Sequence, residues 1–232
     1  METRPACQQD AAVTQTIHHD LQVHHRLPAT YIVDTAYVSG SLLVDSQQTF
    51  GIELFGPALP DTSWQANPAQ GFDVTQFHID WEHEKATCPQ GQAQRYWRRS
   101  IDPQMNPVIY ICFHPKICAA CPVRARCTQS NTGGRTLTLR PQAEHEAIQA
   151  ARQRQQTPLF KEQYAVRAGV EGTMSQAAYA LGMRRTRYRG STRVHLQHVA
   201  TAAAMNLKRA VDWLMEKQRA STRVSPLVAL AA

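Results

Sequence analysis

The sequence contains no apolar stretch near the ~20 residues that a membrane-spanning helix needs. Residues 1–5 also lack the apolar segment of a secretory signal, and no internal repeat is present. These absences predict a globular cytoplasmic protein without a membrane partner. In that compartment, six cysteines are typically reduced thiols or metal ligands rather than a disulfide framework.

Acidic side chains are scarce toward the C-terminus. Residues 151–232 carry fourteen Lys or Arg and four Asp or Glu, whereas residues 1–150 carry eleven and fourteen. A segment of net charge +10 therefore follows one of net charge −3. Such an asymmetry is typical of proteins that bind the phosphates of nucleic acids. A solvated basic helix surface explains the charge equally well.

The first sixty residues have an α/β pattern. Apolar positions before Pro28 predict a short helix that ends at this proline. A β-favouring run at 31–33 then places Asp34 at the end of a strand. A helix is predicted over 41–50 and a second strand over 51–57, so residues 1–60 should contain a βαβ unit.

Helical periodicity is poor between residues 61 and 141, where proline, glycine, tryptophan and cysteine are frequent. We expect an inserted, mostly β subdomain over this range. Its short strands are predicted at 72–79, 108–113 and 135–139.

Residues 142–220 have a helical pattern. Thr157 followed by Pro158 is typical of an N-cap and the first position of a helix. A long amphipathic helix is predicted to follow from Leu196 to Leu214. We expect residues 221–232 to be a flexible tail.

Four cysteines fit a structural metal site. They form a CxxC pair, a third cysteine six positions on and a fourth in an earlier turn, and are Cys88, Cys118, Cys121 and Cys127. Four thiolates complete the tetrahedral coordination of Zn²⁺ and leave no open position, so the ion would stabilise the β subdomain. The alternative is a set of unliganded thiols, and His114 could replace one ligand. Cys112 fits a strand core, while Cys7 is isolated.

Asp34 and Glu171 are candidate ligands for a catalytic metal. A carboxylate at the end of a buried strand usually has a partner or a metal, although a helix cap or a buried hydrogen bond is the commoner role. Glu171 lies one turn after Arg167, and the two could form only a surface ion pair. Two-metal phosphoryl transfer needs carboxylates from distant parts of a chain, which a strand-end Asp and a helical Glu beside an arginine run would supply.

Several short motifs follow one another between residues 17 and 214. They are VDTAYV at 33–38, FGP at 55–57, DTSWQ at 61–65, FHIDW at 77–81, TCPQG at 87–91, the cysteine run at 118–127, and the segments 167–176, 184–190 and 206–209. Together they resemble bacterial insertion-sequence transposases of the DDE class. The resemblance implies an α/β, partial ribonuclease H-like fold, a βαβ unit plus C-terminal helices, with a zinc-ribbon-like β subdomain inserted.

That family uses two Asp and one Glu to bind Mg²⁺ or Mn²⁺ for DNA strand cleavage and transfer. By motif, Asp34 matches the second Asp and Glu171 the Glu. The first Asp would need roughly forty to fifty residues of strands and helix before the second, whereas thirty-three precede Asp34. Asp10 and Asp20 do not lie in strand-like runs. We therefore expect a C-terminal fragment of such a transposase, inactive or nearly so on its own.

The resemblance also implies DNA partners, namely transposon ends and target DNA, and assembly as a homo-oligomer or with a full-length transposase. The predicted DNA-contacting residues share a basic or aromatic character and are Arg167, Arg184, Arg185, Arg187, Tyr188 and Arg189. Tyr188 could stack on a base or pack in the core. Two alternatives stay open: a non-catalytic DNA-binding remnant that regulates transposition, and a small zinc protein unrelated to DNA, against which the localised charge argues.

Overall fold

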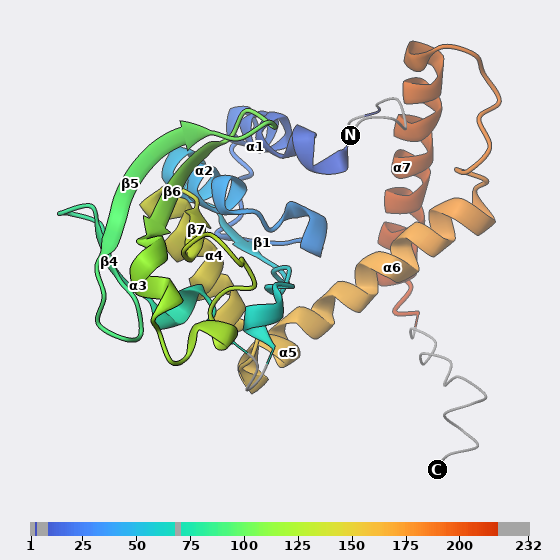
Figure 1. Cartoon of the computed structure of the whole chain (residues 1–232). Coiled ribbons are helices and arrows are strands. Elements are labelled where there is room, and N and C mark those ends of the chain that lie inside the picture. Colours follow the sequence, from blue (N-terminus) through green and yellow to red (C-terminus); the bar gives the residue numbers. More distant parts are fainter. Residues whose placement is uncertain (1–2, 4–8, 68–70, 218–232) are drawn as a thin grey trace. The chain divides into compact units, whose positions relative to one another are not determined.

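The chain forms a mixed α/β protein with two compact units (Figure 1). This computed structural model describes residue 3 and residues 9–67 and 71–217. One unit is Gln9–Arg167, and the other comprises Met1–Gln8 and Ala168–Ala232. None of the described helices is long and apolar enough to cross a membrane. The tail predicted over 221–232 lies outside the described residues, as does Cys7.

The predicted βαβ unit is confirmed. Its elements and the short helices before them are η1 (Asp10–Val13), α1 (Thr14–Val23), β1 (Thr30–Ile32), η2 (Thr35–Tyr37), α2 (Gly40–Phe50) and β2 (Glu53–Phe55). β1 and β2 pair in parallel, with Tyr31 opposite Leu54. The Ser39 hydroxyl accepts the Leu42 N–H at 3.3 Å to cap α2, and Gly51 ends it at φ 68°, a left-handed conformation that favours glycine.

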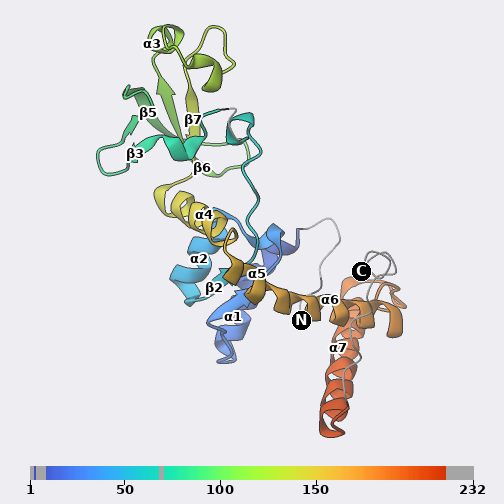
Figure 2. The same cartoon turned by 90° about the horizontal axis from the view of Figure 1, so that it is seen from below.

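Helix α4 (Gln142–Arg154) covers this unit on one side and touches the β-rich subdomain on the other (Figure 2). Its Ile148 and Ala151 join the buried cluster around Ile52 and Leu54. Toward the β-rich side, the His145 ring lies 5.6 Å from that of Trp81. One helix therefore takes part in the packing of both halves of the Gln9–Arg167 unit.

The β-rich subdomain has its own core. Its strands are β3 (His78–Asp80), β4 (Lys85–Thr87), β5 (Gln94–Ile101), β6 (Pro107–Phe113) and β7 (Thr136–Leu139). Its helical turns are η3 (Trp64–Ala66), η4 (Val74–Gln76), α3 (Pro115–Ala119) and η5 (Arg124–Arg126). β3 and β4 form an antiparallel hairpin, and β5, β6 and β7 form an antiparallel sheet in that order. Ile111, Phe113 and Leu137 are almost fully buried between them.

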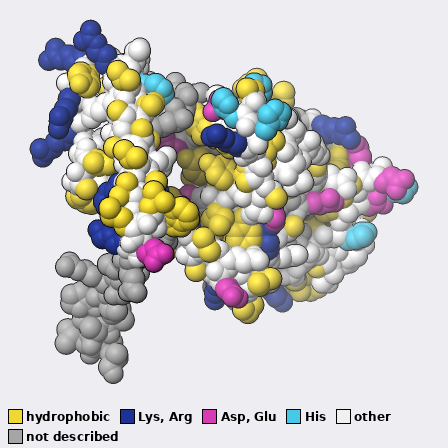
Figure 3. All heavy atoms as spheres, turned by 180° about the vertical axis from the view of Figure 1, so that it is seen from behind, with side chains coloured by type: hydrophobic (Ala, Val, Ile, Leu, Met, Phe, Trp, Pro, Cys, Tyr) yellow, Lys and Arg dark blue, Asp and Glu magenta, His cyan; other side chains and the backbone are white. Residues whose placement is uncertain are grey.

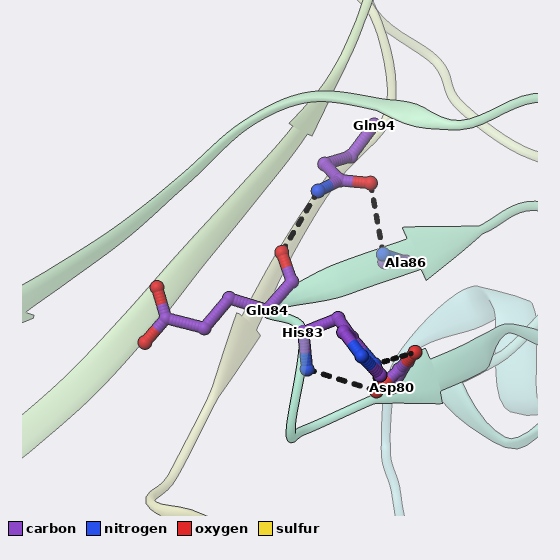
Figure 4. Close-up of polar contacts among 5 residues, drawn as sticks. All are labelled: Asp80, His83, Glu84, Ala86 and Gln94. Atoms are coloured by element: carbon purple, nitrogen blue, oxygen red, sulfur yellow. Dashed lines mark hydrogen bonds and ion pairs between the residues drawn. The ribbon is translucent and has the colours of Figure 1, made fainter.

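Gln94 links the hairpin to the sheet (Figure 4). Its side-chain amide donates to the Glu84 carbonyl at 2.9 Å and accepts the Ala86 N–H at 2.8 Å. Within the hairpin turn, the Asp80 carboxylate accepts the His83 N–H at 3.0 Å. These bonds satisfy backbone groups that the short strands leave unpaired.

Two predictions for this region were incomplete. The strands predicted at 108–113 and 135–139 are present as β6 and β7. Residues 72–79 were predicted as one strand, but η4 interrupts that range because the Asp73 carboxylate accepts the Thr75 N–H and starts a turn. The sequence pattern also missed β5, the longest strand described.

The C-terminal helices are α5 (Pro158–Tyr164), η6 (Ala165–Arg167), α6 (Ala168–Ser175), the π-helical turn η7 (Gln176–Ala180) and α7 (Ser191–Leu214). The predicted N-cap is confirmed, since the Thr157 hydroxyl accepts the Phe160 N–H at 3.2 Å. In its own unit, α7 exposes most of its apolar side chains, and hydrophobic atoms follow it in Figure 3. Leu196 and Leu207 are each 68% exposed.

Candidate functional site

Asp34 lies just beyond the carboxyl end of β1. The Val33 N–H still pairs with the Phe55 carbonyl at 2.9 Å, so the parallel ladder holds the backbone next to Asp34. One Asp34 carboxylate oxygen accepts the Thr35 N–H at 2.7 Å and caps η2. The Asp34 side chain is 54% exposed, so the expected cost of burying its charge does not arise here.

Arg167 pairs with the other Asp34 oxygen at 3.0 Å. Its guanidinium lies 5.9 Å from the centre of the Tyr164 ring, and the Tyr164 hydroxyl donates to the Val33 carbonyl at 3.3 Å. These contacts tie residues 164–167 to the end of β1. An ion pair this exposed contributes at most about 1 kcal/mol to stability, so another ligand can displace the arginine from Asp34 at little cost.

Glu171 is exposed on α6. It belongs to the unit that begins at Ala168, whereas Asp34 belongs to Gln9–Arg167. Two glycines, Gly169 and Gly172, flank it, and no heavy atom beyond the adjacent residues and the helix's own backbone lies within 4 Å of where a side-chain carbon at either glycine would stand. The backbone around this carboxylate is therefore open rather than packed.

The predicted DNA-contacting residues after α6 lie in one irregular segment. This basic loop, residues 183–189, lies between Gly182 and Gly190, whose φ angles are 63° and 91°. Gln197 of α7 holds it by accepting the Arg187 N–H at 3.0 Å and donating to the Arg185 carbonyl at 3.1 Å.

All the side chains of the basic loop that are predicted to contact DNA are exposed to solvent. The four arginines, Arg184, Arg185, Arg187 and Arg189, are exposed. Figure 3 shows Lys and Arg side chains gathered at one end of this unit. Tyr188 is 52% exposed, so the alternative that it packs in a core is wrong. The loop therefore presents cations and one accessible aromatic ring.

The four candidate zinc ligands line one small cavity. Cys88 comes from the turn after β4, Cys118 and Cys121 from α3 and its end, and Cys127 follows η5. Burial raises the pKa of the Cys127 thiol to about 11; the Arg135 guanidinium opposes the rise, and the other three cysteines add to it. The four sulfur groups are thus near enough to interact electrostatically.

These thiols do not yet form a metal centre. Over residues 9–67 and 71–217, no three His, Cys, Asp or Glu side chains lie in an arrangement that could hold a metal ion. His114 instead caps α3, its Nδ1 accepting the Lys116 N–H at 3.3 Å. The four predicted ligands therefore line one cavity, but their side chains are not arranged as a zinc site.

Cys112 lies apart from this cavity. It was expected in a strand core, but it is half-buried on the opposite face of β6. There its sulfur accepts the Thr136 hydroxyl at 3.7 Å. The same face carries Tyr96 and Arg98 of β5, which were not among the residues predicted to contact DNA. The sequence feature that could have revealed these two residues is the run RYWRRS, in which aromatic and arginine residues follow one another without a carboxylate.

Residues 87–211 match the family described as Transposase DDE domain. No curated protein and no solved structure matches the chain significantly. The matched residues make up more than half of the chain and include the four cavity cysteines, Glu171 and the basic loop, while Asp34 precedes them. The resemblance to DDE-class transposases is therefore confirmed, and the chain belongs to the transposase DDE domain family.

Proposed function

We propose that this chain acts in DNA transposition as the part of a DDE-class strand transferase that supplies Asp34 and Glu171 as metal ligands. The observation that carries the proposal is the family match over residues 87–211, which includes Glu171 and the basic loop. Asp34 adds support from outside the match, because it stands at the carboxyl end of a parallel strand pair, where sheet-based sites are commonly built.

The corresponding domain layout is part of the proposal. Residues 1–60 and 142–220 would form a partial ribonuclease H-like catalytic domain, and residues 61–141 an inserted subdomain of zinc-ribbon type. The parallel β1–β2 pair and the covering helix α4 support the first assignment. The separate core of the β-rich region, around Ile111 and Phe113, supports the second.

A divalent cation, Mg²⁺ or Mn²⁺, would activate the attacking water or 3′-hydroxyl and stabilise the leaving oxygen. The exposed Asp34 carboxylate suits such an ion, which prefers oxygen ligands. Thr35 holds one oxygen of Asp34, and the oxygen now paired with Arg167 would face the cation. Arg167 would then be released from Asp34 and could bind a phosphate oxygen of the DNA.

DNA would be held by the basic loop. Its arginines would contact phosphates of the transposon end or the target, and Tyr188 could stack against a base. Within the described residues, β1 is the first strand, so no earlier strand-end carboxylate accompanies Asp34. With two of three carboxylates, the isolated chain should cleave DNA weakly or not at all. Robust metal-dependent cleavage by the purified chain would contradict this expectation.

We also propose that Cys88, Cys118, Cys121 and Cys127 bind a structural Zn²⁺ ion. Their placement around one cavity and the electrostatic effect of three thiols on Cys127 support the idea. Zinc would need the thiols to turn toward a common point and lose their protons. The ion would tie α3 and the segment after η5 to the turn that follows β4.

The proposed catalytic ligands can be tested without relying on turnover. Fe²⁺ substitutes for Mg²⁺ at oxygen sites, and added hydrogen peroxide oxidises it to Fe³⁺ and yields hydroxyl radicals that cut the backbone close to the ion, while ascorbate returns the iron to Fe²⁺. We expect cuts near both Asp34 and Glu171, competed by Mn²⁺. Glu171→Gln should weaken both cuts while DNA affinity stays unchanged. Cuts near only one carboxylate would contradict a shared site.

The same variant distinguishes the alternative function. A non-catalytic DNA-binding regulator would bind transposon-end DNA through the basic loop and show no metal-dependent cuts at Asp34 or Glu171. Glu171→Gln would then alter neither metal response nor DNA affinity. Mixing the chain with an intact transposase of the family would show inhibition in this case.

A further inference from the structure

The sheet β5–β6–β7 has one face in the core and one toward solvent. Trp97, Ile111 and Leu137 point inward and pack with the buried cluster. Because side chains alternate along a strand, their neighbours point outward. Ser100 and Val108 lie on this side too, but Val108 is buried. We call the rest of this surface the outer face; it consists of Tyr96, Arg98, Tyr110, Cys112, Thr136 and Thr138. β5 follows the margin of the Gln9–Arg167 unit in Figure 1.

The outer face is built of two cross-strand rows. In the first, Tyr96 lies opposite Cys112, which lies opposite Thr136. In the second, Arg98 lies opposite Tyr110, which lies opposite Thr138. Neighbours within such a row touch one another and fix each other's positions. The Arg98 guanidinium lies 5.7 Å from the centre of the Tyr110 ring.

Tyr96 offers an accessible ring at the edge of this face. Tyr96 is 45% exposed, and the two threonines that end the rows are exposed and small. A hydrogen bond with the Cys112 thiol raises the pKa of Tyr96, against the nearby Arg98 and Arg95 guanidiniums, which act to lower it. An aromatic ring with two cations beside it is thus presented on a strand.

Anionic groups are missing from the outer face. The residues of β5, β6 and β7 include three arginines and no Asp or Glu. The carboxylate at the end of β5, Asp102, is already paired with Arg140 at 3.1 Å. Glu84 pairs with Arg99, whose side chain leaves the opposite face of β5. The surface is therefore complementary to a polyanion.

We propose that the outer face binds single-stranded DNA, with Tyr96 stacking on a base and with Arg98, held by Tyr110, contacting the phosphates. Stacking requires the flat face of an unpaired base, which a duplex hides between neighbouring pairs. An exposed sheet that combines aromatic rings with cations suits that ligand. The proposal rests on the proposed function only in taking DNA as the substrate; the outer face includes neither Asp34 nor Glu171 and no residue of the basic loop.

The test measures the affinity of the whole chain for a fluorescently labelled single-stranded oligonucleotide and for its duplex by anisotropy. Tyr96→Ala should weaken single-strand binding about tenfold, the size of one lost stacking contact. Arg98→Ala should weaken it as well. Arg99→Ala is the matched control, since it removes an equal charge from the same strand on the other face, and Tyr96→Phe keeps the ring; both should bind as the parent does.

Two results would overturn the proposal. One is single-strand affinity that Tyr96→Ala and Arg98→Ala leave unchanged; the other is a parent chain without affinity for the single strand. Neither result would contradict the proposed function, provided that the chain still binds duplex DNA through the basic loop. Replacing Arg184 and Arg185 by Ala checks this separately, because it should weaken duplex binding and leave the effect of Tyr96→Ala intact.

Discussion

The burial of His18 costs folding free energy, and this cost can be measured. Its side chain on α1 is fully buried, and neither ring nitrogen has a hydrogen-bond partner among the described residues. The rings of Tyr31 and Phe50 stand edge-on to it at 5.6 and 5.4 Å. Desolvation lowers the pKa of His18 below its usual value of 6.5. Burial therefore favours the neutral form of the imidazole in the folded protein.

This burial predicts a loss of stability in mild acid. As the pH falls below about 6.5, the unfolded chain takes up more proton at His18 than the folded chain does, because burial lowers the pKa of His18 in the folded state; the free energy of unfolding therefore falls as the pH falls. His18→Phe should remove this contribution and raise stability by about 1 kcal/mol, because two unsatisfied polar atoms disappear. Urea unfolding of both proteins between about pH 7 and pH 5 measures it.

His145 supplies the control for that measurement. Burial lowers its pKa too, so it adds a parallel loss in acid that His18→Phe leaves in place. If the parent and the variant lose stability equally over the same pH range, His18 is not the group responsible.

At the scale of elements, the cysteine-bearing turns predict a metal-dependent subdomain. Burial raises the pKa of Cys127 to about 11, so this thiol has to lose a proton when a metal binds. If zinc binds, the folded state should gain about 2.7 kcal/mol when free zinc is a hundredfold above its Kd. Cobalt titration, which gives a thiolate charge-transfer band at tetrahedral sulfur sites, reports binding directly.

Cys112 provides a matched control for the zinc prediction. Cys121→Ser should abolish the cobalt band and the stabilisation, whereas Cys112→Ser should preserve both, since Cys112 lies on the other face of β6. Equal responses from the two variants would refute a site at the cavity.

The elements also show what the sequence could predict. The βαβ unit and the cap at Thr157 follow from local patterns, apolar periodicity and turn residues, and these patterns survive in the structure. β5 was missed because its side chains on both faces are partly charged: Arg98 points outward and Arg99 toward Glu84. Neither face of β5 has the apolar alternation that marks a half-buried strand.

The sequence could predict individual residues of the candidate site but not the contacts between them. Asp34 could be placed at a strand end from the β-favouring run before it, yet its exposure depends on neighbours distant in the sequence. Its partner Arg167 lies 133 positions away, and only the fold brings the two to 3.0 Å. The cysteines gather as their spacing suggested, but spacing alone does not orient their thiols.

At the scale of the molecule, the Gln9–Arg167 unit should account for most of the free energy of unfolding. Of the described hydrophobic side chains that are buried, only Ala177 and Met205 lie after Arg167. A fragment of residues 9–167 should therefore unfold cooperatively, with a Tm within about 4 °C of the whole chain, a shift equal to about 1 kcal/mol. Residues 168–217 alone should show no cooperative transition. Circular dichroism melts of the two fragments measure this, and a non-cooperative melt of 9–167 would contradict it.

The exposure of α7 has a spectroscopic consequence. Of the four tryptophans, Trp64, Trp81 and Trp97 are partly buried, whereas Trp213 near the end of α7 is 78% exposed. A collisional quencher such as acrylamide should thus extinguish the red-shifted emission of Trp213 before that of the others. Light emitted by this one indole therefore reports whether DNA or another protein covers α7, without any added label.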